Sequence, residues 1–197
     1  MDLVSRVKNI LITPKTEWQV IEPEQADVKS LYVGYIMILA ALPLIGSIVG
    51  TGLLSPLGIK YGLAFGIVGY VIALVMTYVA ALVANALAPS FGGQSNFIQA
   101  LKLMAFTYTA SWVGGIFTII PIAGALVALL MGLYGLYILY LGVPVMMKVP
   151  KEKTIGYAVV LIVILIVIGV ITGIVAGLVA AIVGGAAAVA GAIPTPN

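Results

Sequence analysis

Ala88-Pro89-Ser90-Phe91-Gly92-Gly93-Gln94-Ser95-Asn96-Phe97 is a polar break between long apolar runs, and the rest of the chain is organised around it. Proline lacks a backbone donor and paired glycines permit a sharp turn, so this stretch (the hinge, residues 88–97) should end one helix. Asn96 can cap the next helix, and Gln99 follows at capping-box spacing. We therefore predict a tight turn between two antiparallel membrane helices.

Composition fixes the class of fold. Of the 197 residues, 63% are hydrophobic and 8% are charged, whereas a soluble domain is about half apolar and about a quarter charged. Apolar runs longer than about 18 residues recur along the chain, as in spanning helices. The sequence predicts an all-α, polytopic transmembrane helical bundle rather than a soluble protein with a very apolar core.

Five spans can be placed by their apolar runs and by the residues that end them. They cover residues 28–50, 61–87, 96–120, 122–146 and 156–183. Asp27 is placed to cap the first span, Pro43 lies inside it, and Pro121 ends the third. The predicted domains are thus a cytoplasmic segment over 1–27, a transmembrane domain over 28–183 and a small-residue tail over 184–197.

The segment before the first span is amphipathic. Leu3, Val4, Val7, Ile10 and Leu11 share one side, with Arg6 and Lys8 between them. Such a helix can lie in the headgroup layer or pack on the cytoplasmic ends of the spans, and both alternatives stay open. Thr13 and Pro14 should restart a helix, and Trp18 is the predicted interfacial anchor. No apolar signal region follows the amino terminus, so we expect no cleaved signal peptide.

Lysine and arginine predict the orientation, because cytoplasmic loops are enriched in both. An amino terminus in the cytoplasm and a carboxyl terminus outside leave only Lys60 on the outer side. The cytoplasmic side then holds Arg6, Lys8, Lys15, Lys29, Lys102, Lys148, Lys151 and Lys153.

Small residues mark a packing face on the fifth span. Gly169, Gly173 and Gly177 recur at every fourth position, which lets another helix approach closely. The partner is either a helix of the same chain or a second copy in a homo-oligomer. Other membrane proteins and the lipid bilayer complete the expected partners.

Polar residues on the second and third spans define a candidate crevice. The set is Asn85, Lys102, Thr107 and Ser111, which could form a polar opening toward the cytoplasm or ordinary hydrogen bonds between helices. On the fourth span, Tyr134 should lie deep enough for its hydroxyl to need a partner.

Reactive groups are scarce. Residues 28–147 contain no acid, histidine or cysteine, and no phosphate-binding loop or nucleophile–base pair appears. We predict no catalytic residue, cofactor site, metal site or nucleic-acid partner. Glu22, Glu24 and Asp27 form an acidic cluster, which could bind a cation or be a solvated loop.

Three stretches of the sequence resemble the Yip family of membrane proteins, in its prokaryotic form. They are RVKNILITPKTEW (6–18), FGGQSNFIQALKLMAFTYTASW (91–112) and IPIAGALVALLMGLYGLYILYLGVPVMMKVPKEKTIGY (120–157). The resemblance implies five spans, a cytoplasmic amino terminus and, in a prokaryote, a plasma or inner membrane location. Eukaryotic members act in membrane traffic and bind small GTPases. Their Asp-Leu-Tyr-Gly-Pro signature is missing before the first span here, which counts against small-GTPase binding.

Two functions follow as hypotheses. The first is a non-enzymatic integral membrane protein that organises membrane or protein partners. The alternative is a passive channel or small-solute transporter built around the candidate crevice.

Overall fold

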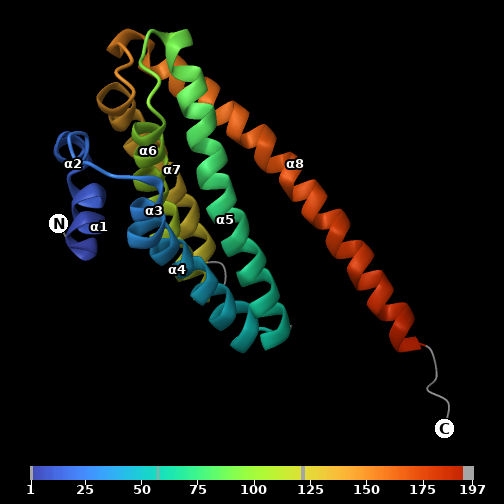
Figure 1. Cartoon of the computed structure of the whole chain (residues 1–197). Helices are drawn as coiled ribbons and strands as arrows, with labels where there is room; N and C mark the ends of the chain where they lie inside the picture. Colours follow the sequence, from blue (N-terminus) through green and yellow to red (C-terminus); the bar gives the residue numbers. More distant parts are fainter. Residues whose placement is uncertain (1, 57, 121–122, 193–197) are drawn as a thin grey trace. The chain divides into compact units, whose positions relative to one another are not determined.

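The computed structural model describes residues 2–56, 58–120 and 123–192, with side chains described as far as Ile171 and at Ile174. Every regular element in these ranges is helical, as predicted (Figure 1). The chain divides into two units, residues 1–158 and 159–197. The helices are α1 (Leu3–Ile12), α2 (Pro14–Ile21), α3 (Val28–Leu31), η1 (Tyr32–Ile36), α4 (Met37–Ser47), η2 (Ile48–Leu53), α5 (Ile59–Leu87), η3 (Ala88–Phe91), α6 (Phe97–Gly115), η4 (Ile116–Ile119), α7 (Ala123–Met146) and α8 (Lys151–Ala192).

Helix α6 is the centre of the first unit. Most of its residues are buried, and it packs against α4, α5 and α7 (Figure 1). Among the described residues, four stretches are long and apolar enough to cross a membrane, namely Val28–Leu53, Ile59–Phe91, Ala123–Met146 and Lys151–Ile171. They coincide with four of the five predicted spans. Helix α6 is not among them. Its neighbours cover it, so it meets protein side chains on most of its surface, and the count of five spans stays a prediction.

The hinge forms the expected turn between α5 and α6. After the η3 turn, Gly92 takes φ +76°, a left-handed conformation that glycine adopts without a Cβ penalty. The Asn96 side chain accepts a hydrogen bond from the Gln99 backbone N–H at 3.2 Å, so the cap is confirmed. The Gln99 side chain does not complete the capping box. Its amide instead donates to the Glu22 carbonyl at 2.9 Å, which ties α6 to the loop after α2.

The other predicted caps differ from one another. Asp27 caps α3 in a capping box with Ser30, at 2.6 Å and 3.0 Å. Pro14 occupies the first turn of α2 as expected, but Thr13 makes no side-chain cap. The Thr13 hydroxyl donates back to the Asn9 carbonyl at 3.2 Å, so it satisfies the end of α1 rather than the start of α2.

Close helix packing in the first unit occurs where the first span crosses the end of α6. A Cβ added at Gly46 would lie 2.6 Å from the Gly115 carbonyl oxygen, and one added at Gly50 would lie 2.6 Å from the Thr118 carbonyl oxygen. Pro43, predicted inside this span, packs its ring on Gly115. The span also contains two wide π-helical turns, η1 and η2. Such turns often occur at functional sites, and η1 lies beside the pocket described below.

Helix α8 runs from Lys151 to Ala192, so it begins before residue 156 and extends beyond residue 183, the bounds predicted for the fifth span. The first nine residues of the predicted tail are therefore helical. The side chains of positions 173 and 177 lie outside the described residues. The packing face of Gly169, Gly173 and Gly177 accordingly stays a prediction.

Candidate functional site

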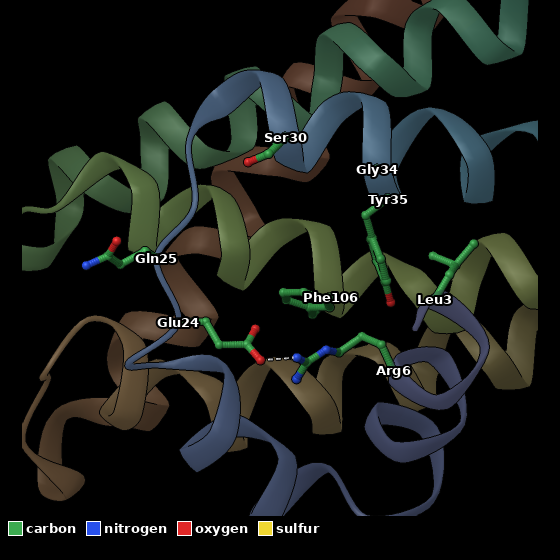
Figure 2. A pocket seen from close by; sticks show the side chains of 8 residues that line it. All are labelled: Leu3, Arg6, Glu24, Gln25, Ser30, Gly34, Tyr35 and Phe106. Carbon is green, nitrogen blue, oxygen red and sulfur yellow. Dashed lines mark hydrogen bonds and ion pairs between the residues drawn. The ribbon is translucent and has the colours of Figure 1, made fainter. Parts of the chain in front are cut away.

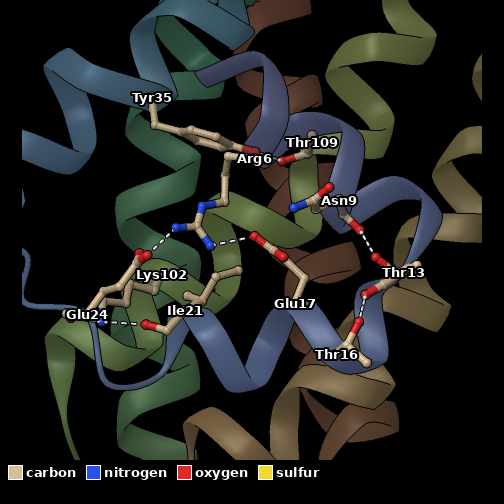
Figure 3. Close-up of polar contacts among 10 residues, drawn as sticks. All are labelled: Arg6, Asn9, Thr13, Thr16, Glu17, Ile21, Glu24, Tyr35, Lys102 and Thr109. Carbon is tan, nitrogen blue, oxygen red and sulfur yellow. Dashed lines mark hydrogen bonds and ion pairs between the residues drawn. The ribbon is translucent and has the colours of Figure 1, made fainter. Parts of the chain in front are cut away.

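A buried charge network joins α1 and α2 and faces α6 (Figure 3). Arg6 donates to the Glu17 carboxylate at 2.6 Å, and both side chains are almost fully buried. A second guanidinium nitrogen of Arg6 pairs with Glu24, and the guanidinium carbon lies 5.8 Å from the centre of the Phe106 ring. The two carboxylates compensate the charge of Arg6, which a buried guanidinium requires.

Lys102, on α6, reaches the carboxyl end of α2. Its ammonium donates to the carbonyls of Ile21 at 3.0 Å and Glu22 at 3.3 Å, and also to that of Glu24. The last carbonyls of a helix lack intrahelical donors and carry partial negative charge, so a cation there is stabilised. Lys102 therefore holds the end of α2 against the central helix (Figure 3).

Trp18 completes the docking of α2. The ring is fully buried, its indole N–H donates to the Ile138 carbonyl of α7 at 3.1 Å, and it packs edge-on to Phe106. This placement differs from the predicted contact with lipid headgroups. The amphipathic pattern correctly marked an apolar face on this segment: Ile10, Trp18 and Ile21 are fully buried against the bundle, whereas Val4, predicted on the same side, is exposed. Of the two open alternatives for α1 and α2, the structure shows packing on the bundle.

A pocket of about 470 Å³ opens beside this network. It is lined by Leu3 and Arg6 of α1, Glu24 and Gln25 of the following loop, Ser30 of α3, Gly34 and Tyr35 of η1, and Phe106 of α6 (Figure 2). The Tyr35 hydroxyl is paired with Thr109 at 2.7 Å, and the Tyr35 and Phe106 ring centres lie 4.6 Å apart. The pocket therefore combines an ionised rim with an aromatic floor.

The structure does not gather the predicted crevice residues around one opening. Lys102 faces α2, whereas Ser111 and the Thr107 backbone lie within 4 Å of the Cβ position of Gly135 on α7. Among the residues that the structure describes, neither the buried Thr107 hydroxyl nor the buried Asn85 side-chain oxygen has a hydrogen-bond partner. The predicted partner for the Tyr134 hydroxyl is found in the Leu11 carbonyl, at 2.8 Å.

Each member of the acidic cluster has its own role. Glu22 pairs with Lys148 at 2.9 Å and Glu24 pairs with Arg6. Asp27 caps α3, and the hydrogen bonds from the Ser30 backbone and side chain hold the pKa of Asp27 below its ordinary value. Within the described ranges, no three acidic, histidine or cysteine side chains are placed to hold a metal ion.

Sequence reasoning missed the Arg6, Glu17, Tyr35 and Phe106 group. One signal was available, because Arg6 lies within the apolar stripe of α1, one turn from Leu3 and Ile10. A charge at such a position is either solvated or paired inside the protein. The pattern of α1 alone does not identify Glu17 as its partner.

Four membrane-length apolar helices in the described part of the chain define a multi-pass integral membrane protein. The family model described as Yip1 domain matches residues 8–173. The chain thus belongs to the Yip1 domain family, which confirms the predicted resemblance.

Curated relatives agree with this class of protein. The chain is 24% identical over 166 residues to "Inner membrane protein YohC" of Escherichia coli strain K12, with 79% of this chain and 85% of the relative covered. The protein of the same name from Escherichia coli O6:H1 gives the same values. No solved structure matches the chain.

Proposed function

We propose that this chain is a non-enzymatic integral membrane protein that organises membrane or protein partners through the outward side of α1 and α2. This outer face consists of Val4, Lys8, Ile12, Lys15 and Val20, all exposed. The main support for this proposal is that buried contacts fix α1 and α2 to α6 and α7, while the outer face remains exposed to solvent or lipid. A fixed, exposed surface can present contacts without first being ordered, which lowers the entropic cost of binding.

The composition of the outer face fits a membrane-proximal contact. Val4 is 75% exposed and Ile12 is 66% exposed, so the face offers apolar surface to a partner. Lys8 and Lys15 flank them, as expected next to an anionic lipid surface or an acidic partner. Lipid, another membrane protein and a second copy of the chain are the partners proposed. No feature of this face suggests small-GTPase binding.

The channel alternative has weaker support. Lys102 faces α2, Ser111 and the Thr107 backbone lie beside Gly135 of α7, and Asn85 lies on α5, so the described contacts do not bring the four residues together. We therefore do not propose transport.

The proposed orientation places the amino terminus in the cytoplasm and the carboxyl terminus outside, supported by the distribution of lysine and arginine. A reporter fused after Asn197 should be active only on the outer side. Activity of that reporter in the cytoplasm would refute the five-span count or the orientation.

Site-specific photo-crosslinking in native membranes tests the outer face. A crosslinker at Ile12 should give discrete adducts with a protein or with a second copy of the chain. A crosslinker at Val75 on α5, 56% exposed on an apolar surface, is the matched control and should give mainly lipid adducts. Lipid adducts alone at Ile12, as at Val75, would contradict the binding of a protein partner or a second copy by this face.

A further inference from the structure

The pocket in Figure 2 lies at the start of the first span. Its wall is formed by Ser30 and Gly34, within the first two turns after Asp27 caps the helix. A helix that enters a bilayer carries its first turns at headgroup level, so the pocket opens where lipid headgroups are found.

Among the side chains that line the pocket, the accessible charged group is the Glu24 carboxylate; the Lys102 ammonium, which donates to the Glu24 backbone carbonyl, is buried. Arg6 is neutralised by Glu17 and Glu24, and its side chain is only 7% exposed. The Glu24 side chain is 41% exposed, and only one of its oxygens is needed for the ion pair with Arg6. An anionic ligand would approach a carboxylate and a compensated guanidinium, which is unfavourable. A cationic group would find a partner in Glu24.

The floor of the pocket is aromatic. The Tyr35 and Phe106 rings lie together there, 6% and 5% exposed, and the Arg6 guanidinium already lies 5.8 Å from the Phe106 ring centre, so the rings offer a ligand an apolar wall. The Tyr35 hydroxyl is already engaged with Thr109, so the ring contributes its face and edge rather than a hydrogen bond. An ammonium group between Glu24 and these rings would be held by a charged oxygen and by aromatic surface.

An exposed apolar stripe continues from the pocket along the first span. Val33, Met37, Ile38 and Ile45 follow Ser30 and Gly34 on the same side of the helix, and all four are exposed. At about 1.5 Å per residue, the stripe from Val33 to Ile45 is about 18 Å long. Half of a hydrocarbon core is about 15 Å, so the stripe is slightly longer than the apolar depth of one leaflet.

We propose that this pocket binds the primary ammonium headgroup of a phosphatidylethanolamine-type lipid, with its acyl chains along the stripe. The ammonium donates to Glu24, and the aromatic floor excludes water from that bond. A quaternary ammonium cannot donate a hydrogen bond, so phosphatidylcholine should bind more weakly. This lipid site does not depend on the proposed partner contacts of the outer face. The crosslinking result at Ile12 therefore does not decide whether the pocket binds lipid, and the lipid-binding result does not decide whether the outer face binds a partner.

Native mass spectrometry of the purified full chain, with lipids added at equal concentration, tests the proposal. Phosphatidylethanolamine should bind about tenfold or more tightly than phosphatidylcholine, and phosphatidylglycerol should bind most weakly. Glu24→Gln should remove the preference for phosphatidylethanolamine. Gly34→Leu should fill the wall of the pocket and weaken binding about tenfold.

Gly34→Leu keeps the test decisive if Glu24→Gln fails to fold. A Cβ at Gly34 meets no atom within 4 Å, so a leucine there should not disturb packing. Gly69→Leu on α5 is the matched control, because Gly69 is also exposed with no atom within 4 Å of its Cβ position, and it should bind as the parent does. Equal binding of phosphatidylglycerol, or parental binding by Gly34→Leu, would overturn the proposal. Displacement of the lipid by soluble ethanolamine at a similar concentration would overturn the lipid assignment in favour of a free amine.

Discussion

Removing Arg6 should release α1 and α2 from the bundle. In Arg6→Ala, the buried Glu17 carboxylate loses the guanidinium at 2.6 Å, and the contact with Phe106 is lost as well. Breaking a buried ion pair by deleting one partner costs about 3–5 kcal/mol, because the remaining charge is uncompensated.

A more exposed ion pair, between the end of α2 and the loop after α7, provides the comparison. Lys148 and Glu22 are 2.9 Å apart, with side chains 45% and 31% exposed. Lys148→Ala should therefore cost about 1 kcal/mol or less. The double variant Arg6→Met with Glu17→Leu should recover most of the loss, because no unpaired charge then remains buried.

Hydrogen exchange of the α1 and α2 amides, in detergent, measures this docking directly, since a segment can open without global unfolding. Protection should fall strongly in Arg6→Ala and hardly at all in Lys148→Ala. Equal protection in these two variants would refute the argument that the Arg6 network holds the segment in place.

Three further predictions follow from the helix contacts and caps. Gly46→Ala should lower the denaturation midpoint in detergent, because its Cβ would lie 2.6 Å from a backbone oxygen, whereas Gly132→Ala, with no atom within 4 Å, should leave the midpoint unchanged or raise it. Gly173→Leu should weaken thermal stability or self-association far more than Ile174→Leu, and equal small effects would show that the glycine face meets lipid. Because the pKa of Asp27 is lowered in the folded protein, its cap contributes stability at pH values above the ordinary pKa of 3.8. Amide protection in α3 should therefore fall as the pH drops through the lowered pKa. Amide protection that does not change with pH would contradict this.

The apolar helices could be predicted from the sequence because each is determined by residues close together in the chain. Hydropathy located four membrane-length helices, and the hinge residues located the turn before α6. The Asn96 and Asp27 caps were also predictable, since each cap and its bonded partner lie three residues apart.

The docking of the amino-terminal segment could not be predicted in the same way. Lys102 binds carbonyls about eighty positions earlier in the chain, and any loop backbone offers such acceptors. Trp18 illustrates the same limit, because a tryptophan beside an amphipathic helix suits a lipid interface and a protein interior equally well. Only the arrangement of α6 and α7 decides between them, and the pocket depends on that arrangement too.

The polarity of α6 has a consequence for how the protein is made. This helix is long enough to cross a bilayer but is not among the helices apolar enough to do so alone, and it carries Lys102. An insertion machinery that tests segments one at a time would release it poorly into lipid. We expect α6 to enter the membrane only in company with α5 and α7, so a nascent chain that ends before α7 should leave this segment accessible to water.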